Sequence, residues 1–414
     1  LRVTAVNLFS VDFLLDSDTL YTVEKGRLYF YGNGYHVRAD KDASRAFWIA
    51  RRCQNTPELV KRNRHPLADA GRVEDLHNGC IRVHYLNTAR FHVGDCYTIY
   101  DVRRQYVGIF LNRCRDIQLD NIKQRHNESL ALVVQDSENI TLSRSEFAPE
   151  PGCVRQLASA ADFMQFCMCR GKITIQNCRF KGAGDDCLNV HGIHFLITEV
   201  QDNYWTVRFM HPQTHGFNPL REGDTVALIH PQTLLEFGRA TILSSELISE
   251  TEILLCVDHA ADGIKGAVIE NISACPDLFF HDNTLTKIIT RGLLITTRGK
   301  VEVKNNHFVC TAMSGILLSD DAKSWYESGM CQDVLIQGNR FAYCGETPIL
   351  IKPENNRHEG AVHRNITIID NSFEQYPDPA VVARSTDNLT LSGNRLSHGS
   401  LLKTEHCTHV KTND

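Results

Sequence analysis

One short phrase recurs along the chain and limits what the chain can fold into. In each copy a polar residue precedes alternating apolar and polar residues, and several copies continue into Asn and then a large apolar residue. Except across the gap between Lys172 and Lys300, adjacent copies are 23, 32 or 33 residues apart. Repeats of about 20 to 50 residues that contain short strands indicate stacked coils, in which each turn covers the apolar face of its neighbour. The copies begin at Asp116, Asn139, Lys172, Lys300, Asp333, Asn365 and Asn388.

We therefore predict an all-β protein whose body is a right-handed parallel β-helix, a solenoid. A second short apolar run precedes several copies, as at 131–134 and 315–318. The longer steps contain insertions, at 148–161 and 323–331, and insertions in solenoids gather on the functional face. A leucine-rich repeat is the competing solenoid, but its Leu-x-x-Leu-x-Leu pattern does not occur here.

Two regions interrupt the repeat. Residues 17–95 and 195–265 contain short alternating runs with Gly-rich turns between them, which is typical of antiparallel hairpins. We predict that each is an inserted antiparallel β-barrel subdomain, and that the second one forms a wall of the functional site. The parallel β-helix would then consist of residues 1–16, 96–194 and 266–414.

The composition limits the kinds of molecule that the protein is expected to bind. The 414 residues include 42% hydrophobic and 22% charged residues, as in soluble globular proteins, and the formal net charge is −5. The sequence has no Lys/Arg block of the kind that binds nucleic acid, and no apolar run of about 18 residues that would cross a membrane. A neutral ligand is therefore expected, and a homo-oligomer is left open.

The 15 cysteines bear on compartment and on metal binding. An odd number leaves at least one thiol unpaired, which favours a reducing, cytoplasmic location. A secreted or periplasmic location stays open, because Leu1 begins the chain as a fragment would and an amino-terminal portion is expected to be missing. Cys167 and Cys169 lack a matching downstream Cys or His pair, so we predict that they fill the core and that the protein has no metal site.

Three aspartates are the predicted catalytic residues. Asp185 and Asp186 follow the glycine-rich turn Gly182-Ala-Gly184, and Asp162 lies 23 residues before Asp185. Because stacked strands are about 4.8 Å apart, a step of one repeat would place Asp162 directly over Asp185. Crowded carboxylates separate into a protonated acid and an ionised base, as glycoside hydrolysis requires. Which aspartate takes which role is left open, and a calcium site is the weaker alternative because no Asp-x-Asp-x-Asp loop occurs.

A second cluster is predicted to bind substrate. Asp320, Asp321, Trp325 and Glu327 lie within one insertion, and a Trp ring among carboxylates is a common platform for a sugar. A loop anchored by a buried Trp is the alternative. His191 follows the aspartate pair and is expected to bind a sugar hydroxyl, with a role as a core histidine as the alternative.

These motifs resemble glycoside hydrolase family 110, the α-1,3-galactosidases that remove terminal galactose from blood-group-B-type and related glycans. The resemblance spans nearly the whole chain. It implies a β-helix with two barrel insertions, an inverting mechanism without metal or cofactor, and catalytic roles for Asp162, Asp185 and Asp186. The motifs that carry it are 161–166, Cys169-Arg-Gly171, 185–192, Pro231-Gln-Thr-Leu234 and 320–329.

Two alternatives remain from other classes. Polygalacturonases are β-helices with a Gly-Asp-Asp-Cys turn, but the Asn-Thr-Asp, Gly-His-Gly and Arg-Ile-Lys elements with which they bind a uronate chain are absent from this sequence. A non-catalytic β-helix that binds glycans would not need a carboxylate one turn away from a carboxylate pair. Loss of turnover with retained binding after mutation of Asp185 distinguishes an enzyme from such a binder.

Overall fold

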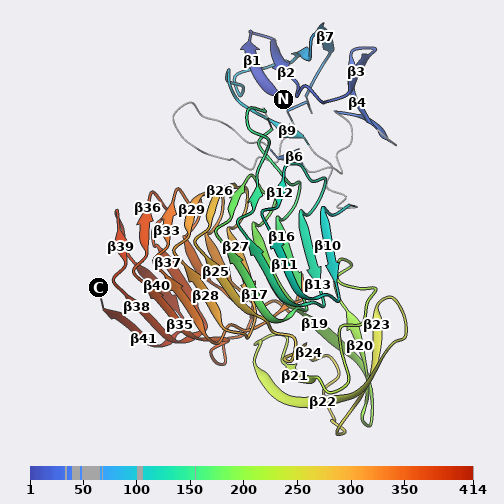
Figure 1. Ribbon diagram of the computed structural model, residues 1–414, viewed down its shortest axis with the longest axis vertical. Helices are drawn as coiled ribbons and strands as arrows, with labels where there is room; N and C mark the ends of the chain where they lie inside the picture. The colour runs from blue at the N-terminus through green and yellow to red at the C-terminus, as the bar shows by residue number, and fades with distance from the viewer. Residues whose placement is uncertain are drawn as a thin grey trace.

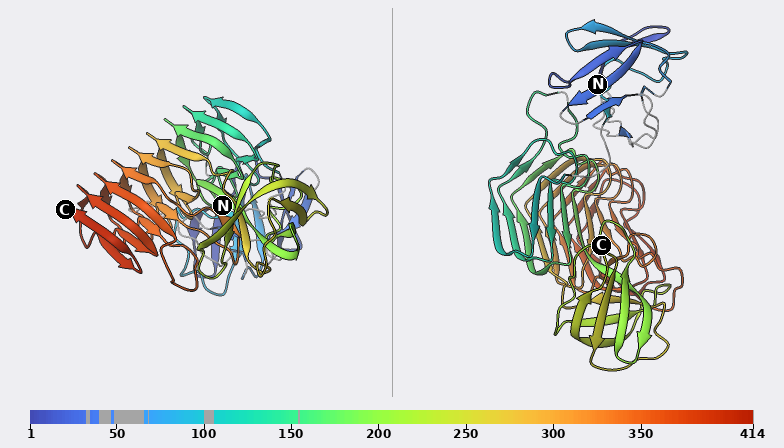
Figure 2. Two further views of the ribbon diagram at one scale, coloured as in Figure 1. Left: turned by 90° about the horizontal axis from the view of Figure 1, so that it is seen from below. Right: turned by 90° about the vertical axis from the view of Figure 1, so that its right-hand side faces the viewer.

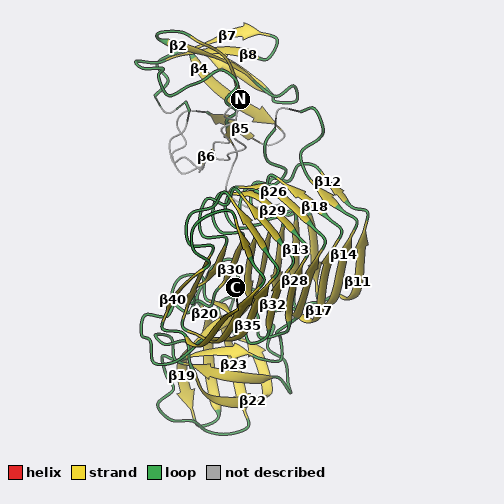
Figure 3. Ribbon diagram, turned by 90° about the vertical axis from the view of Figure 1, so that its left-hand side faces the viewer, coloured by secondary structure: helices red, strands yellow, loops and turns green. Residues whose placement is uncertain are grey.

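Three parallel sheets run along a solenoid and form the body of the molecule (Figure 1). The computed structural model describes residues 1–32, 35–39, 47–48, 66–67, 69–99, 106–153 and 155–413. Within these ranges no residue is helical, and Figure 3 shows strands joined by loops. Each complete turn of the solenoid contributes one strand to each sheet.

The strands of the three sheets follow one another in the order of the chain. The first sheet contains β10 (Ile109–Asn112), β13 (Leu132–Gln135), β16 (Met164–Cys167), the start of β19 (Leu188–Gln201), β27 (Leu293–Thr296), β30 (Ile316–Leu318), β34 (Ile349–Ile351), β37 (Val381–Arg384) and β40 (Leu402–Glu405). The second contains β11 (Arg115–Asp120), β14 (Glu138–Ser143), β17 (Arg170–Gln176), β25 (Asp277–His281), β28 (Val301–Lys304), β32 (Val334–Gln337), β35 (His363–Ile369), β38 (Thr386–Ser392) and β41 (Thr408–Asn413). The third contains β12 (Lys123–Gln124), β15 (Glu146–Phe147), β18 (Arg179–Lys181), β26 (Thr284–Ile288), β29 (His307–Thr311), β33 (Arg340–Ala342), β36 (Ser372–Glu374) and β39 (Arg395–Leu396).

The recurring phrase of the sequence forms the strands of the second sheet. Val301 pairs with Val334, Val334 with Ile366 and Ile366 with Leu389, so the spacing in the sequence is the register of the sheet. The apolar residues of the phrase point inward and are fully or almost fully buried in these turns. The prediction of an all-β parallel β-helix is confirmed.

The interior is ordered by two kinds of stacked side chain. Phe308, Phe341 and Phe373 stack on adjacent turns, with ring centroids 4.8 and 5.2 Å apart. Beside them, a ladder of buried asparagines closes the turn between the second and third sheets. In this ladder the Nδ2 of each residue donates a hydrogen bond of 2.9–3.1 Å to the Oδ1 of the next, in the order Asn283, Asn306, Asn339, Asn371 and Asn394.

The ladder begins differently from the sequence expectation. Asn177 is the Asn of the phrase in this turn, but Cys178 occupies the position in the ladder, and its backbone N donates to Asn283 Oδ1 at 2.9 Å. Asn177 lies one residue earlier with a φ of 54°, in the left-handed region that Asn tolerates. The thiol of Cys178 takes the place of the amide, because its Sγ accepts a hydrogen bond of 3.5 Å from the backbone N of Ser145 in the preceding turn.

Residues of the second interruption form a closed antiparallel barrel. Its strands are the end of β19, β20 (Tyr204–Phe209), β23 (Glu252–Val257), β22 (Glu236–Leu247), β21 (Thr225–Ile229) and β24 (Val268–Asn271), and β24 and β20 both pair with β19. β19 thus begins as a solenoid strand and ends as a barrel strand. The barrel includes β24, whereas the predicted boundary places this strand in the β-helix (266–414), because the sequence does not show that it pairs with β19 and β21.

A buried ion pair ties the barrel to the solenoid. Arg170 at the start of β17 donates to both carboxylate oxygens of Asp224, at 2.9 and 2.7 Å, and Asn271 Nδ2 donates to Asp224 at 2.7 Å. The two side chains of the ion pair are 13% and 8% exposed. The second view in Figure 2 places the barrel at the opposite end of the molecule from the N-terminal sheets.

The N-terminal region is antiparallel, as expected for 17–95, but it begins earlier. β1 (Arg2–Val6) pairs with β2 (Ser10–Leu14), β2 pairs with β8 (Cys80–His84) and β8 pairs with β7 (Val73–His77), so the strands within residues 1–16 belong to this sheet and not to the β-helix. β2 pairs with residues about 70 positions away, a partnership that its own sequence does not specify. Further antiparallel pairs join β3 (Tyr21–Glu24), β4 (Arg27–Gly32) and β5 (Tyr35–Arg38), and β6 (Phe47–Trp48) with β9 (Thr98–Ile99). The other predicted domain boundaries stay predictions, and part of the first interruption lies outside the described residues.

Within the described residues, no cysteine forms a disulfide bond. Many of the thiols lie in the core, and burial raises the pKa of the Cys169 thiol to about 12. In the same ranges, the structure contains no helix of the length and apolar character needed to span a membrane.

Candidate active site

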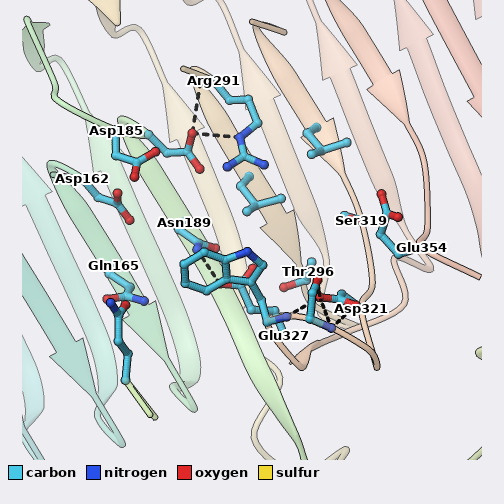
Figure 4. A pocket seen from close by; sticks show the side chains of 16 residues that line it. Asp162, Gln165, Asp185, Asn189, Arg291, Thr296, Ser319, Asp321, Glu327 and Glu354 are labelled. Atoms are coloured by element: carbon cyan, nitrogen blue, oxygen red, sulfur yellow. Dashed lines mark hydrogen bonds and ion pairs between the residues drawn. The ribbon is translucent and has the colours of Figure 1, made fainter. Parts of the chain in front are cut away.

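A pocket with a volume of about 310 Å³ lies on the outward face of the first sheet (Figure 4). Its floor comes from β16, β19, β27 and β30, because alternate side chains of each strand point outward. The register of these strands aligns the outward residues across neighbouring turns. The floor consists of Gln165, Asn189, Leu294 and Leu317 in one row, followed by Thr296 and Ser319.

The glycine-rich turn brings the aspartates together. A Cβ at Gly182 or Gly184 would lie 2.2–2.5 Å from backbone atoms of the insertion at 156–160, and Gly182 has a φ of 78°. Only glycine allows the insertion to pack so closely against the turn. Asp162, at the end of the insertion, therefore lies beside Asp185 at one end of the pocket (Figure 4).

The register of the aspartates differs from the expected one. β16 and β19 pair Met164 with Leu188, a step of 24 residues, so Asp162 is level with Asp186 and not with Asp185. The 23-residue step belongs to adjacent strands of the second sheet, such as β11 and β14. The turns between strands of the first sheet have different lengths, and the step in that sheet is therefore one residue longer here. All three aspartates line the pocket nevertheless.

Asp186 is held by the next turn of the solenoid. Its Oδ1 accepts hydrogen bonds from Thr290 Oγ1 at 2.7 Å, from the Arg291 backbone N at 3.1 Å and from Arg291 Nε at 2.9 Å. Asp186 is 2% exposed. Burial alone would lower the pKa of Arg291, but the charges of Asp186, Asp185 and Glu327 raise it above its ordinary value. Arg291 is thus a fixed positive charge among these carboxylates.

The loop 320–331 forms a second side of the pocket. Its short strand β31 (Glu327–Ser328) pairs with Gly192 and Ile193 of β19 in antiparallel fashion. A Cβ at Gly192 would lie 2.5 Å from Ser328 Oγ, so glycine is required for this close approach. The aspartate turn and this loop are therefore held together through β19.

Asp321 organises the same loop. Its carboxylate accepts hydrogen bonds from the backbone N of Lys323 at 2.9 Å and of Trp325 at 2.6 Å, and from Ser324 Oγ at 2.6 Å. Burial alone would raise the pKa of Asp321, but these hydrogen bonds hold the pKa below its ordinary value. Asp321 lines the pocket, and it also fixes the loop that carries Trp325.

The barrel contributes the third side. In the segment between β20 and β21, Gln213 lines the pocket and the ring of His211 lies 4.4 Å from the ring of Trp325. Trp325 is 46% exposed, so it is not the buried anchor of the alternative interpretation. The structure agrees with the expectation that the second insertion walls the site.

Two predicted substrate-binding residues do not line the pocket. Asp320 is fully buried and its Oδ1 accepts a hydrogen bond from His194 Nε2 at 2.8 Å. His191 is 1% exposed; its Nδ1 lies 2.8 Å from the Gly192 carbonyl oxygen and its Nε2 lies 3.2 Å from Gln165 Nε2. Asp320 is buried at the start of the loop by its contact with His194 of β19, and His191 lies on β19 beside the residues that pair with β31. These contacts join distant parts of the chain, and the sequence does not reveal them. Asp321, Trp325 and Glu327 line the pocket as expected.

Several lining residues were missed by the sequence analysis. Arg291 lies just before the apolar run of β27. In the register of β19 and β27 it occupies the position that Asp186 occupies one turn earlier, so a comparison of residues at equivalent positions in successive turns would have found it. Gln165 and Asn189 are polar residues at outward positions, where polar residues are usual. Glu354 forms ion pairs of 3.1 Å with Lys323 and Lys352. The missed residues are Gln165, Asn189, Gln213, Arg291, Leu294, Thr296, Leu317, Ser319, Ser324 and Glu354.

The pocket is rich in carboxylates, and Arg291 is the cationic side chain of its lining. Among the described residues, no three His, Cys, Asp or Glu side chains are grouped so that they could hold a metal ion. Carboxylates accept hydrogen bonds from hydroxyl groups and repel anions. The chemistry that fits this lining is acid–base chemistry on a neutral compound with many hydroxyls.

Comparison with family models defines the class of the protein. Residues 291–413 match the model described as the right handed beta helix region, and residues 205–263 match GLAA-B beta-barrel domain II. The chain is therefore a right-handed parallel β-helix protein that carries a barrel of the GLAA-B type.

Individual relatives define the family. The chain is 35% identical to Alpha-1,3-galactosidase A of Bacteroides thetaiotaomicron, over 90% of this chain and 66% of that protein. It is 34% identical to the protein of the same name from Bacteroides fragilis, over 92% of this chain and 64% of that protein. The chain belongs to the family of these proteins, glycoside hydrolase family 110, and spans less than two thirds of their length. A solved structure titled "Glycoside hydrolase" covers 99% of this chain and 73% of that chain with a TM-score of 0.43 and 10% identity, a similarity too low to bear on function.

Proposed function

We propose that the protein is an exo-acting, inverting glycoside hydrolase that releases terminal α-1,3-linked galactose from blood-group-B-type or linear α-galactosyl glycans. The observation that carries the proposal is the meeting of Asp162, Asp185 and Asp186 at one end of the pocket. The names of the relatives support a galactosidase.

Inverting hydrolysis needs two carboxyl groups on opposite sides of the scissile bond. One donates a proton to the leaving oxygen, and the other takes a proton from the water that attacks the anomeric carbon from the opposite face. Three neighbouring aspartates can supply this pair of carboxyl groups. Arg291 and Thr290 hold Asp186 in place and thereby fix one side of the pair.

The walls of the pocket favour a terminal sugar. The loop 320–331 and the barrel segment with Gln213 enclose the floor on two sides, which suits the end of a glycan better than the middle of a polymer. The exposed ring of Trp325 offers a surface for the apolar C–H face of a sugar. The surrounding carboxylates oppose a uronate, which counts against the polygalacturonase alternative.

The test follows the anomer that is released. We would incubate the protein with B-type trisaccharide, linear α-1,3-galactobiose, A-type trisaccharide and oligogalacturonate, and record proton NMR spectra from the first minutes. We expect β-galactose as the first product from the first two substrates, because inversion of an α-linkage gives the β-anomer. Early release of α-galactose would contradict inversion, and cleavage of oligogalacturonate alone would replace the proposed substrate.

Variants connect this activity to the three aspartates. Asp162→Asn, Asp185→Asn and Asp186→Asn should each lower turnover by about 10²- to 10⁴-fold, the range that a general acid or base contributes. Asp333→Asn, which changes an exposed aspartate at the start of β32, is the matched control and should keep the rate of the wild type. Normal rates from all three site variants would exclude the proposed catalytic residues.

A further inference from the structure

We infer that Gln165 and Asn189 form a sugar-binding pair in which each amide presents its carbonyl oxygen to the pocket, because His191 and Glu327 hold the two NH₂ groups from behind. The two amides are in register on adjacent strands, β16 and β19, and both line the floor of the pocket. The identity of the sugar rests on the proposed function, whereas the orientation of the amides rests on the contacts described below.

The orientation of Asn189 follows from Glu327. Asn189 Nδ2 donates a hydrogen bond of 2.9 Å to Glu327 Oε1. An ionised carboxylate only accepts hydrogen bonds, so the NH₂ group must face it and the carbonyl oxygen must point elsewhere. Asn189 is 5% exposed, and its Oδ1 is buried without a hydrogen-bond partner among the described residues. Buried polar atoms are nearly always paired, so this acceptor indicates a donor that a ligand supplies.

The orientation of Gln165 follows from His191. The Gly192 carbonyl oxygen, 2.8 Å from His191 Nδ1, can only accept, so Nδ1 carries a hydrogen. An imidazole whose single hydrogen is on Nδ1 accepts at Nε2; Gln165 Nε2 lies 3.2 Å from this nitrogen and Glu327 Oε1 lies 3.9 Å from it. The NH₂ group of Gln165 is thereby engaged, and its carbonyl oxygen is the acceptor left for the pocket. The same arrangement thus occurs on two successive turns.

This pair selects for hydrogen-bond donors. Adjacent strands lie about 4.8 Å apart, so the two carbonyl oxygens can receive two hydroxyl groups of one sugar ring. A carboxylate of a uronate has no hydrogen to donate at neutral pH and gains nothing from these acceptors. His191, which the sequence analysis expected to bind the sugar, acts on it through Gln165 as a positioning residue, and Glu327, which itself lines the pocket, also positions Asn189.

The test exchanges the carboxylate and the amide of Glu327 and Asn189. We would measure the binding of galactose by titration calorimetry to the wild type, Asn189→Asp, Glu327→Gln and the double variant. Each single change should weaken binding about tenfold or more: Asn189→Asp sets two carboxylates against each other, and Glu327→Gln allows the Asn189 amide to turn over. In the double variant the amide introduced at position 327 donates to the carboxylate introduced at position 189. The other oxygen of that carboxylate again faces the pocket, so binding should return to within about threefold of the wild type.

The remaining variants keep the inference falsifiable. Gln165→Met removes the other acceptor at a half-buried position and should also cost about tenfold in binding, even if Asn189→Asp fails to fold. Glu302→Gln, on the outer side of the second sheet, is the control for the Glu-to-Gln change and should bind as the wild type does. A double variant no better than the weaker single variant would overturn the inference, as would normal binding by Gln165→Met.

A panel of sugars separates this inference from the proposed function. Glucose, mannose and N-acetylgalactosamine would be tested beside galactose on the wild type. Binding of another sugar in place of galactose would remove the proposed substrate, and the rescue by the double variant with that sugar would still support the amide pair. Binding of none of these sugars would overturn both.

Discussion

His363 shows how the fold constrains a single titratable residue. The side chain is fully buried at the start of β35, and its Nδ1 accepts a hydrogen bond of 3.0 Å from the backbone N of Cys331. Burial lowers the pKa of His363 to about 4, against 6.5 for an ordinary histidine. Below pH 6.5 the unfolded chain therefore binds a proton that the folded protein does not bind, and folding loses free energy as the pH falls.

We expect a stability profile that depends on His363. The stability that neutral His363 contributes should be fully present above pH 6.5 and lost as the pH falls to about 4. The difference of about 2.5 between the pKa of His363 in the unfolded chain and in the folded protein corresponds to about 3 kcal/mol. In His363→Asn the amide oxygen replaces Nδ1 as acceptor and cannot titrate. Urea unfolding at pH 7 and at pH 4.5 should therefore show a smaller acid loss for this variant than for the wild type. Exposed His307→Asn is the control, and equal acid losses in all three proteins would contradict the expectation.

Single residues were predictable from the sequence where their chemistry is rare at their position. Adjacent aspartates after a glycine turn and a Trp among acids stand out, and Asp185, Asp186 and Trp325 line the pocket. Gln165 and Asn189 could not be distinguished from the many polar residues that face solvent along the strands. His191 could not be placed beneath other residues, because the segments that cover it come from distant parts of the chain.

At the scale of an element, the asparagine ladder should carry much of the stability of the turns. Asn339 accepts from the backbone N of Asn306 at 2.9 Å and donates to Asn371 Oδ1 at 3.0 Å, and all three residues are fully buried. Asn339→Ala leaves a buried N–H without an acceptor, together with two carbonyl oxygens without donors. We expect a loss of about 3 kcal/mol, since each unpaired group costs about 1–3 kcal/mol.

The midpoint of urea unfolding measures this loss. Thr390→Ala, at an outward position of β38, removes a side chain of similar size outside the ladder and should change stability by less than about 0.5 kcal/mol. If both variants unfolded at the same urea concentration, the ladder would have no special role.

A strand was predictable from the sequence where the pattern that defines it lies within a few residues of the chain, and less so where it depends on a distant partner. The strands of the second sheet follow from alternation within a few residues, and their register from the spacing of the repeat. The barrel closes through β24, and the N-terminal sheet is joined through the pairing of β2 with β8; both pairings depend on partners far away in the chain. The 24-residue step between β16 and β19 depends on turn lengths that alternation does not show.

At the scale of the whole molecule, Arg170 and Asp224 hold the barrel in place. Arg170→Met would leave the carboxylate of Asp224 buried with Asn271 as its remaining side-chain donor among the contacts described here. We expect a loss of about 3–5 kcal/mol, as for other broken buried ion pairs, and faster hydrogen exchange in β20–β23 than in β35–β41. Mass spectrometry of peptides after deuterium labelling measures both regions at once.

The control uses an ion pair with a second cation. Asp136 is bound by Arg113 and also by Arg221, at 3.2 and 2.6 Å, so Arg113→Met leaves the carboxylate paired. Exchange in the barrel should then stay close to that of the wild type. A uniform rise in exchange over the whole chain in Arg170→Met would mean that the barrel and the solenoid unfold as one unit.

The passage of β19 from the solenoid into the barrel has a consequence for how substrate enters. Its residues Leu188–His191 pair within the first sheet and Phe195–Gln201 pair within the barrel, while Gly192 and Ile193 between them pair with β31. Hydrogen bonds thus brace the strand on both sides of the junction, which gives the barrel no hinge there about which to swing. On the proposed function, discrimination between branched and linear glycans would then depend on the shape of the pocket opening and not on a swing of the barrel.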